Sequence, residues 1–474
     1  DWDLEYATID DHCRRTSQAS FLELLERGEI YQAVRPVMWD VDFRTAIAQA
    51  EVTDKEVSSA YHFLRFGIEG TEEYVVIATT RPELLPACVA VLAHPDDERY
   101  RKYIGRNAVT PLFYAPVPIM ADPKADPEKG TGIVMVCTYG DQTDVEWQRQ
   151  YQLPVRQVLD WDGRLMPLTF VGPGSTNGGD GVFVSLRPDE ANAAYQQIQG
   201  KYVKQAQRAL IEYAESLDAA GGAFRIIDRP KQEIKHVVRF FEKGDRPLEW
   251  IPARQWFCRI LEHRDALIEQ GRKINWTPKH MGIRYEHWVE GLNQDWCLSR
   301  QRFFGVPVPV WYRLDEQGRV LYDQRLLPSR DRLPIDPLDD VPAGYSEEQR
   351  DQPGGFTGDP DVLDTWATSS LTPQIASKWV DDPERHARLF PMDVRPQAHE
   401  IIRTWAFYTI VKAWLHERQI PWKNVLISGW VLDPDRKKMS KSQGNVVTPE
   451  PVIEQFSADS VRYWSARARL GVDT

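Results

Sequence analysis

The sequence predicts an α/β fold in which a β-rich module interrupts a domain of alternating helices and strands. Its 474 residues exceed the roughly 250–300 at which a single core stops growing, so we expect two or three domains. Helical and strand-like segments alternate at both ends of the chain, whereas short β-like segments separated by Pro, Gly and Asp fill the middle. We therefore expect a first part at 1–55, an inserted module at 56–226 and a second part at 227–474.

The elements follow from apolar spacing and from turn-forming residues. In the first part, the apolar spacing predicts a helix at 14–27, a strand at 31–39 and an Ala-rich helical or turn-like stretch at 43–52. In the inserted module, the sequence pattern predicts five β-like segments, at 61–68, 74–79, 87–93, 117–120 and 133–137. A loop at 172–181 and a stretch of helix formers at 191–217 follow. From about residue 226 the α/β pattern resumes and includes β-like residues 425–427.

Composition restricts the class of protein. With 58 Lys and Arg against 70 Asp and Glu, the net charge is −12, which argues against a uniformly basic nucleic-acid coat but permits a local basic groove. The longest apolar runs, such as 87–93 and 305–311, are far shorter than the ~20 residues that span a bilayer, so we expect no membrane association. Five scattered cysteines and an acidic start without a signal peptide indicate the cytoplasm.

The strongest chemical signal is a segment near the C-terminal end that contains Lys438, Met439, Ser440, Lys441 and Ser442, followed by Gln-Gly-Asn. Ammonium and hydroxyl groups on such a loop suit a polyphosphate whose charge grows in a transition state. A Lys/Ser cluster taken alone is also typical of a solvated basic turn. The ordered pentapeptide resembles the signature loop of the class I aminoacyl-tRNA synthetases. The resemblance implies that Lys438 and Lys441 bind the pyrophosphate portion of ATP, which enters with Mg²⁺.

A second segment, 293–311, offers aromatic side chains and two arginines beside a Gly/Pro turn. These groups can line a pocket for a small apolar ligand and an anion, although an aromatic core corner with surface arginines is an equal alternative. The segment is similar to the Trp-Cys-x-Ser-Arg-Gln-Arg block of the synthetases that activate valine, isoleucine and leucine. In that family Trp296 would shape the amino-acid pocket.

A third block separates those three specificities. Asp364-Thr-Trp366, followed later by His399-Glu400, resembles the valyl branch rather than the isoleucyl branch. The resemblance implies that Asp364 and Trp366 belong to the amino-acid pocket, and that His399 and Glu400, with Met439 and Lys441, bind the adenylate. Without the resemblance, His399 and Glu400 would be interpreted as an ordinary polar helix start.

The inserted module carries Thr79, Thr80 and Arg81 and, further along, Asp141 and Asp144. Hydroxyls beside an arginine, with two carboxylates three residues apart, can hold an ammonium group, a ribose or phosphate, and a water. A Thr-Thr-Arg-Pro strand end alone is usually a turn. Together the segments resemble the editing domain of the valyl, isoleucyl and leucyl enzymes, which hydrolyses mischarged tRNA.

The resemblance also assigns roles to these editing residues. It implies that Asp144 anchors the threonine ammonium, that Arg81 and the two threonines lie near the tRNA terminus, and that Asp141 supports them. Editing is needed because an apolar pocket rejects threonine relative to valine only ~10²-fold, a known property of this pair rather than a result of this sequence. The chain departs from the commonest valyl pattern at Leu84, Met135, Cys137 and Gly140.

Two features of the family do not occur in this sequence. No His-x-Gly-His motif is present, and the chain starts and stops abruptly, so we expect a truncated chain that does not activate amino acids alone. Cysteine pairs that bind zinc in relatives are replaced by Asp and Phe near Trp39 and Phe241, residues that cannot form a sulfur site. We therefore expect no structural zinc and no other bound metal.

The complete interpretation is the body of a class I valyl-tRNA synthetase. It comprises a Rossmann-like, doubly wound parallel-sheet catalytic domain at 1–55 and 227–474, interrupted by an editing domain at 56–226. Its expected partners are valine, ATP and tRNA(Val), and it is expected to act as a monomer in the cytoplasm. Two alternatives stay open, namely a non-activating fragment that only binds tRNA or edits, and an isoleucyl-tRNA synthetase.

Overall fold

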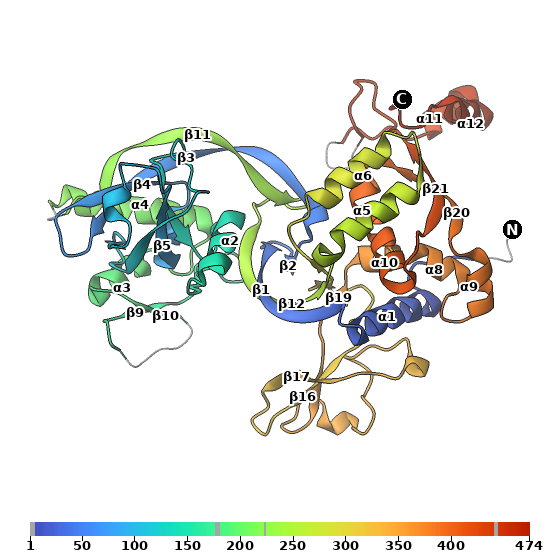
Figure 1. The fold of residues 1–474 in the computed structure, drawn as a ribbon, viewed down its shortest axis with the longest axis horizontal. Helices are drawn as coiled ribbons and strands as arrows, with labels where there is room; N and C mark the ends of the chain where they lie inside the picture. The colour runs from blue at the N-terminus through green and yellow to red at the C-terminus, as the bar shows by residue number, and fades with distance from the viewer. Residues whose placement is uncertain (1–4, 176–180, 222–223, 440–443) are drawn as a thin grey trace. The chain divides into compact units, whose positions relative to one another are not determined.

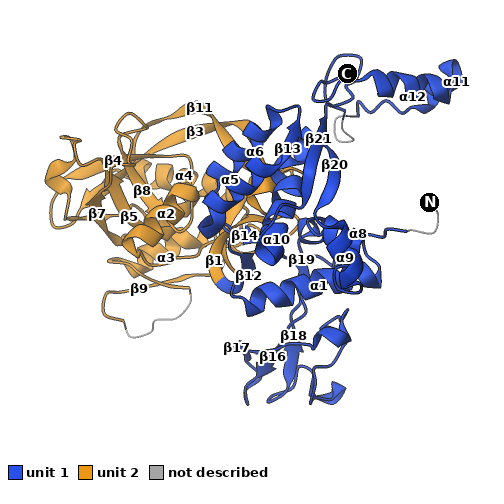
Figure 2. Ribbon diagram, turned by 45° about the vertical axis from the view of Figure 1, so that its right-hand side comes forward, with its two compact units in different colours: residues 1–33, 255–474 blue, residues 34–254 orange. Residues whose placement is uncertain are grey.

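The computed structural model describes residues 5–175, 181–221, 224–439 and 444–474 (Figure 1). The chain divides into two compact units, which we call unit 1 (Asp1–Ala33 with Gln255–Thr474) and unit 2 (Val34–Arg254) (Figure 2). Strands β1 (Ile30–Asp40) and β12 (Glu249–Cys258) carry the chain between them. The mixed α/β fold class is confirmed, since parallel and antiparallel strands both occur with many helices. The predicted domain boundaries at 56 and 226 stay a prediction.

Unit 1 is organised around a parallel sheet in the order β13-β21-β20. Its strands are β13 (Asn275–Thr277), β20 (Met392–Ala398) and β21 (Trp422–Ser428). Val425 and Ile427 of the central strand are fully buried, as expected for a parallel sheet covered by helices. Both outer strands run parallel to β21, so the carboxyl ends of all three strands lie at one edge of this sheet.

The other elements of unit 1 are nine α-helices and six short strands among the described residues, and three of these strands form a small antiparallel sheet in the order β17-β16-β18. The helices are α1 (Asp11–Glu26), α5 (Arg264–Lys273), α6 (Met281–Glu290), α7 (Thr365–Ser369), α8 (Thr372–Ser377), α9 (Pro383–Leu389), α10 (Phe407–Glu417), α11 (Glu450–Phe456) and α12 (Ala458–Arg467). The remaining strands are β14 (Trp296–Cys297), β15 (Ser299–Arg300), β16 (Trp311–Leu314), β17 (Val320–Leu326), β18 (Phe356–Gly358) and β19 (Val362–Leu363). Helix α1 begins where the Asp10 carboxylate accepts a hydrogen bond from the Cys13 backbone N–H at 2.8 Å, a side-chain N-cap.

Unit 2 contains a seven-stranded sheet in the order β11-β3-β6-β7-β5-β8, with β4 also paired to β3. The strands of this sheet are β3 (Val52–Ile68), β4 (Tyr74–Thr79), β5 (Cys88–Ala93), β6 (Asn107–Val109), β7 (Pro116–Ala121), β8 (Ile133–Cys137) and β11 (Ile227–Phe241). Outside it, β2 (Thr45–Ala46) pairs with β1, and β9 (Thr169–Val171) pairs with β10 (Val182–Val184). The helices of unit 2 are α2 (Gln142–Tyr151), α3 (Pro188–Gln196) and α4 (Val203–Ala219). The long antiparallel pairing of β3 with β11 is visible as a curved ribbon in Figure 1.

Most predicted elements are confirmed, and one needs correction. The helix at 14–27, the strand at 31–39 and the five β-like segments of the inserted module all occur, within a few residues of the expected bounds except that β3 starts earlier. The stretch at 43–52, expected to be helical or turn-like, takes the turn-like form, with turns, β2 and a short 3₁₀ segment. The stretch at 191–217 is divided into α3 and α4, because the chain turns at Gly200, whose φ of +73° favours glycine.

Three further expectations concern loops, strand order and membranes. The predicted loop at 172–181 falls partly outside the described residues, since 176–180 are not described. The chain after residue 226 first forms β11, which extends the sheet of unit 2 before β12 leads into unit 1. Among the described residues, every helix is too short or too polar to cross a bilayer.

Candidate active sites

The two motif segments of unit 1 that lie sixty residues apart form neighbouring strands. Ser299 and Arg300 of β15 pair antiparallel with Leu363 and Val362 of β19. The backbone N–H of Asp364 then donates to the Leu298 carbonyl at 2.6 Å. This pairing places Trp296 beside Asp364, and the indole Nε1 of Trp296 donates to Asp364 Oδ2 at 3.0 Å. Two residues predicted for the amino-acid pocket are therefore in direct contact.

Asp364 is also the partner of a buried arginine and the cap of a helix. Nη2 of Arg300 lies 3.1 Å from Asp364 Oδ2, and both side chains are almost completely buried. The other carboxylate oxygen accepts the backbone N–H of Trp366 at 3.1 Å at the start of α7. The indole of Trp366 is half-buried on this helix. Asp364 thus fixes Trp296 and the start of α7, and its carboxylate is already occupied by protein groups.

Helix α10 and the π-helical turn before it (Ile402–Ala406) add aromatic groups to the same region. The indole of Trp296 stacks on Tyr408 with ring centroids 3.9 Å apart. Nε1 of Trp405 donates to the carbonyl of Ser369, the last residue of α7, at 2.8 Å. Single π-helical turns inside helices occur frequently at functional sites.

The predicted adenylate residues follow the carboxyl ends of adjacent parallel strands. Ala398, the last residue of β20, is paired with Ser428, the last residue of β21, so His399 and Trp430 come from neighbouring strand ends. Their rings lie 4.4 Å apart. In parallel α/β sheets, ligands bind in the crevice outside these strand ends. The position of His399 is therefore one at which the fold itself favours a ligand.

Charged groups surround His399 and Trp430. Nη1 of Arg284 lies 3.0 Å from Nδ1 of His399, and Nζ of Lys438 lies 4.6 Å from the centroid of the Trp430 ring. His399 and Lys438, which are predicted to act on the same nucleotide, thus both lie against the indole of Trp430. Oε2 of Glu400 is buried and has no hydrogen-bond partner among the described residues, so this carboxylate is available to a ligand.

The signature loop is described only on both sides of its centre. Ser440, Lys441 and Ser442 lie outside the described residues. On the flanks, Asn445 Nδ2 donates to Asp433 Oδ2 at 2.8 Å and to the Lys438 carbonyl at 3.1 Å. The Sδ atom of Met439 accepts the Val447 N–H at 3.2 Å. These contacts tie the two flanks of the loop together.

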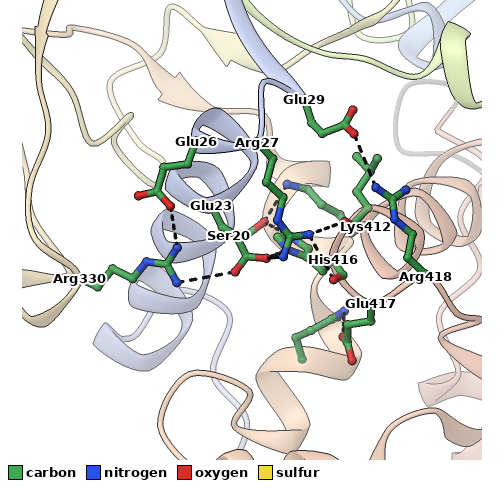
Figure 3. A network of polar contacts seen from close by, with 12 residues as sticks. Ser20, Glu23, Glu26, Arg27, Glu29, Arg330, Lys412, His416, Glu417 and Arg418 are labelled. Carbon is green, nitrogen blue, oxygen red and sulfur yellow. Dashed lines mark hydrogen bonds and ion pairs between the residues drawn. The ribbon is translucent and has the colours of Figure 1, made fainter.

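A buried polar network joins α1 to α10 (Figure 3). Nζ of Lys412 donates to Ser20 Oγ at 2.9 Å, and Ser20 Oγ also lies 2.8 Å from Nε2 of His416. Nδ1 of His416 is 3.0 Å from Glu23 Oε1. Burial lowers the pKa of Lys412 to about 8 and that of His416 to about 4. The Lys412 ammonium lies 5.9 Å from the Trp296 ring centroid, which connects this network to the candidate pocket.

In unit 2, Arg81 lies between two buried carboxylates. Its Nε donates to Glu83 Oε1 at 2.8 Å, and its Nη2 is 2.8 Å from Glu249 Oε2. Burial by itself would lower the pKa of Arg81, but the charges of Glu249 and Glu83 raise it above its ordinary value. Thr79, at the end of β4, orients this turn because its hydroxyl oxygen accepts the Arg81 backbone N–H at 3.0 Å.

The two predicted carboxylates of unit 2 both stabilise the start of α2. Asp141 is the N-cap, since its Oδ1 accepts the backbone N–H of Asp144 at 3.0 Å. Oδ2 of Asp144 accepts the N–H of Gly140 at 2.9 Å and that of Cys137 at 3.3 Å. Burial, and then the charge of Asp141, raises the pKa of Asp144 well above its usual range.

Gly140 connects this helix start to Arg81. Nη1 of Arg81 donates to the Gly140 carbonyl at 3.4 Å, so the two predicted halves of the editing site adjoin each other. A Cβ atom at Gly140 would lie 2.5 Å from Asp144 Oδ2. The absence of a side chain at this position is therefore required for the observed orientation of Asp144.

A family model described as "tRNA synthetases class I (I, L, M and V)" matches residues 1–474. The chain belongs to this family. Among curated relatives, a Valine–tRNA ligase of Thermobifida fusca is 52% identical over all of this chain and 52% of its own length. Those of Salinispora tropica and Leifsonia xyli subsp. xyli are 52% and 48% identical, each over 53% of its own length. The synthetase chain thus spans about half the length of these relatives.

Among solved structures, the synthetase chain is similar to a crystal structure of a ternary complex of Agrobacterium radiobacter K84 LeuRS with tRNA and LeuAMS. The TM-score is 0.40 at 18% identity, over 96% of this chain and 56% of that one. A methionyl-tRNA synthetase of Mycobacterium tuberculosis with bound methionyl-adenylate gives a TM-score of 0.35 at 21% identity, over 50% of this chain and 38% of that one.

Several groups at the synthetase sites were not singled out from the sequence. Trp405 and Tyr408 could have been found from the density of aromatic residues after His399, whereas Glu249 is 168 residues from Arg81 and has no local signal. Burial and the charge of Asp359 raise the pKa of Asp361 to about 7, a shift that is enriched at functional sites. Among the described residues, no three His, Cys, Asp or Glu side chains are grouped as metal ligands.

Proposed function

We propose that this chain is the catalytic and editing body of a valine–tRNA ligase. It would activate valine with ATP, transfer valine to tRNA(Val) and hydrolyse threonyl-tRNA(Val). The observation that carries the proposal is the full-length match of this chain, at about half identity, to relatives named Valine–tRNA ligase. The positions of His399 and Lys438, each against the ring of Trp430 and near the ends of parallel strands, support a nucleotide site in unit 1.

In the proposed activation step, a valine carboxylate oxygen attacks the α-phosphorus of ATP. The bond from this phosphorus to the bridging oxygen breaks, and pyrophosphate leaves with the additional negative charge. Lys438 and Lys441 would neutralise that charge, helped by the hydroxyls of Ser440 and Ser442 and by the Mg²⁺ that accompanies ATP. His399, Glu400 and Met439 would border the adenylate. The unpartnered Oε2 of Glu400 is suited to accept a hydroxyl hydrogen bond from the ribose.

The amino-acid pocket would be formed by the aromatic groups around α7. Trp296 is held on one face by Tyr408 and at its N–H by Asp364, so its plane is fixed before the ligand arrives. Trp366 on α7 would supply a second wall. A rigid apolar pocket of this kind can exclude isoleucine by size but cannot strongly exclude threonine. The proposed pocket therefore requires a second site that removes threonine.

Unit 2 would provide that second site. Water attacks the ester carbonyl of threonyl-tRNA(Val), the bond to the ribose oxygen breaks, and threonine and tRNA are released. Oδ2 of Asp144 is held by two backbone N–H groups, while Oδ1 makes no hydrogen bond within the described residues and would accept the threonine ammonium. An ammonium there would lower the raised pKa of Asp144 and favour its ionised form. Thr79, Thr80 and Arg81 would lie near the tRNA terminus, and Asp141 would hold the helix start.

We further propose that the protein acts as a monomer in the cytoplasm without structural zinc. None of the five cysteines, all of which are described, forms a disulfide, in keeping with a reducing compartment. Metal analysis of the purified protein tests the zinc proposal, and one equivalent of zinc per chain would contradict it.

Two assays on the 474-residue chain test the proposal. Valine-dependent exchange of pyrophosphate into ATP measures activation, with isoleucine and threonine as comparison amino acids. Hydrolysis of threonyl-tRNA(Val), with valyl-tRNA(Val) as the control ester, measures editing. We expect valine to be the preferred amino acid and threonyl-tRNA(Val) the preferred ester. Preference for isoleucine would identify an isoleucyl enzyme instead.

Ligand binding distinguishes a valine–tRNA ligase fragment that does not activate valine from a chain that has another function. A non-hydrolysable valyl-adenylate analogue at about 100 times its Kd should stabilise unit 1 by about 2.7 kcal/mol, even if exchange is undetectable. Stabilisation without exchange, together with ester hydrolysis, would identify an editing chain that does not activate valine. Absence of both stabilisation and hydrolysis would contradict the proposed function.

A further inference from the structure

Residues 471–474, which we call the closing segment, pair with the chain that leaves strand β21. The backbone N–H of Thr474 donates to the Trp430 carbonyl at 2.9 Å, and the Thr474 carbonyl accepts the Leu432 N–H at 2.8 Å. Trp430 and Leu432 belong to the stretch that leads from β21 to the signature loop, and Lys438 of that loop lies against the Trp430 ring. The closing segment is therefore bonded to the start of the signature loop.

Two glycines allow the closing segment to approach the strand ends closely. Gly429 is the first residue after β21, and a Cβ atom there would overlap the carbonyl of Val472. Gly471 has a φ of +73°, and a Cβ atom there would lie 2.5 Å from Cγ of Pro278, the first residue after β13. The closing segment thus lies against the carboxyl ends of two parallel strands, the edge at which α/β sheets bind ligands.

Asp473 connects the closing segment to the third strand end. Its Oδ1 accepts the backbone N–H of Trp430 at 2.8 Å, and the same oxygen lies 3.6 Å from Nε2 of His399, the first residue after β20. The other ring nitrogen of His399, Nδ1, lies 3.0 Å from Nη1 of Arg284. Because a guanidinium group can only donate, Nδ1 must accept, and the proton of the neutral imidazole is on Nε2. This N–H faces Asp473.

The contact between Asp473 and His399 is at ion-pair distance, longer than a hydrogen bond. Contacts of this length in ligand-free sites often shorten when the ligand binds. Among the described residues, Asp473 is the one carboxylate within ion-pair distance of His399. The His399 side chain is only 11% exposed, so protein groups rather than water determine how the ring is oriented.

We propose that Asp473 is a positioning residue of the nucleotide site in unit 1, where it orients the Nε2–H of His399 and holds the backbone of Trp430. The rings of His399 and Trp430 lie 4.4 Å apart, so a single carboxylate oxygen fixes both groups before the ligand arrives. None of the sequence motifs indicated Asp473. The inference rests on the proposed activation function for the identity of the ligand, an adenine nucleotide or adenylate.

Nuclear magnetic resonance of the chain, labelled with isotopic nitrogen in histidine, tests this positioning without any ligand. The Nε2–H signal of His399, assigned by its absence in His399→Gln, should be visible because Asp473 slows its exchange with water. Asp473→Asn keeps an oxygen that can accept N–H groups and should keep the signal, whereas Asp473→Ala should lose it. Asp459→Ala is the matched control, because Asp459 is an exposed acid of α12 that pairs with Arg462 at 3.4 Å.

Two results of this experiment would overturn the inference. One is an equally sharp His399 signal in Asp473→Ala and in the control Asp459→Ala. The other is absence of the signal from the unmodified chain, since the imidazole N–H would then exchange freely with water.

Binding of a non-hydrolysable valyl-adenylate analogue, measured by calorimetry on the same variants, tests the consequence for the site. Asp473→Ala should weaken binding by about tenfold, whereas Asp473→Asn should stay within about threefold of the unmodified chain. In pyrophosphate exchange by the full-length parent protein, Asp473→Ala should raise the KM for ATP while kcat stays within about twofold. A change in kcat alone, or an equal loss in the alanine and asparagine variants, would contradict positioning through Oδ1.

The two measurements separate this inference from the proposed function. If the unmodified chain binds the analogue and Asp473→Ala binds it equally well, only the inference about Asp473 fails. If the His399 signal depends on Asp473 but neither the chain nor the parent protein binds the analogue, the proposed activation function fails. The orientation of His399 by Asp473 would then stand without a nucleotide as its ligand.

Discussion

Arg300 and Asp364 form an ion pair that water does not reach. Nη2 of the arginine lies 3.1 Å from Oδ2 of the aspartate, with side-chain exposures of 1% and 2%. The same carboxylate receives the N–H of Trp296 and starts α7. A buried pair of this kind adds little net stability compared with apolar residues, but it is costly to break because one charge is left unpaired. Its value in this chain is the fixed geometry of the surrounding aromatic groups.

The first prediction concerns this pair. Asp364→Ala should lower the free energy of unfolding of unit 1 by about 3–5 kcal/mol, because Arg300 would remain buried without its partner. Urea unfolding followed by tryptophan fluorescence measures the loss. Arg319→Ala removes one partner of an exposed pair with Asp315 and should cost less than about 1 kcal/mol. Similar losses in the two variants would show that the buried pair has no special cost.

The second prediction concerns the pH dependence of His416. Its pKa is lowered by burial to about 4, whereas an unfolded histidine titrates near 6.5. Between these values the unfolded chain binds a proton that the folded chain does not, so stability falls as the pH falls. Lowering the pH from 6.5 to 4.5 should therefore cost the unmodified chain about 2.5 kcal/mol more than His416→Gln. Urea midpoints measured across this range test the difference, and parallel curves would contradict it.

The third prediction separates capping from chemistry at Asp141. Asp141→Ala should destabilise the start of α2 by about 1 kcal/mol, whereas Asp141→Asn should cost much less, because asparagine caps helices equally well. If Asp141 acts only by holding this helix, Asp141→Asn should also keep hydrolysis of threonyl-tRNA(Val) near the unmodified rate. Loss of hydrolysis in a stably folded Asp141→Asn would instead show that the carboxylate itself takes part.

The fourth prediction concerns Arg81 and its two carboxylates. Arg81→Met would leave Glu83 and Glu249 buried without their cation, so the pKa of Glu249, already raised by burial, would rise further above that of the unfolded chain. Such groups destabilise most at high pH and are relieved by protonation as the pH falls. The stability deficit of the variant, about 3 kcal/mol at pH 8, should therefore shrink at pH 5. Thermal melts at both values provide the measurement, and a deficit independent of pH would refute this electrostatic account.

The fifth prediction is a division of labour between Lys441 and Asp144. Lys441→Ala, made in the full-length parent protein, should reduce valine-dependent pyrophosphate exchange by about 10²-fold or more, since it removes a charge that stabilises the transition state. The same variant should hydrolyse threonyl-tRNA(Val) normally. Asp144→Ala should show the reverse pattern. Loss of both activities in either single variant would contradict two separate sites.

Local pattern predicted much of the fold but little of the long-range pairing. The alternating apolar residues of β4 and β8 and the helical spacing of α1 were sufficient to predict these three elements, because each element is specified by residues that are neighbours in sequence. The division of 191–217 into α3 and α4 was missed, because good helix formers on both sides concealed the turn at Gly200. Strand β11 was assigned to the resumed α/β pattern, and only its pairing with β3 reveals its sheet.

In the candidate sites, too, the sequence did not reveal contacts between residues that are distant in the chain. Motifs indicated Trp296, Asp364 and His399 as separate signals, but the sequence does not show that Asp364 is saturated by Arg300 and Trp296. Nor does it show that His399 and Lys438 both contact the ring of Trp430, because the contact of His399 depends on strand ends brought together by the parallel sheet. Partners that are distant in sequence carry no local signal, and they decide which charges are available to a ligand.

The ribbon of β3 and β11 has a practical consequence for protein engineering. Val52 at one end of the ribbon is paired with Phe241, so the first and last residues of the segment 52–241 are neighbours about 5 Å apart. A piece cut at these two points would have adjacent ends, and a tight hairpin turn could join them into a closed loop. The segment is therefore a candidate for excision, for circular permutation or for transplantation into another scaffold through a single hairpin-sized attachment.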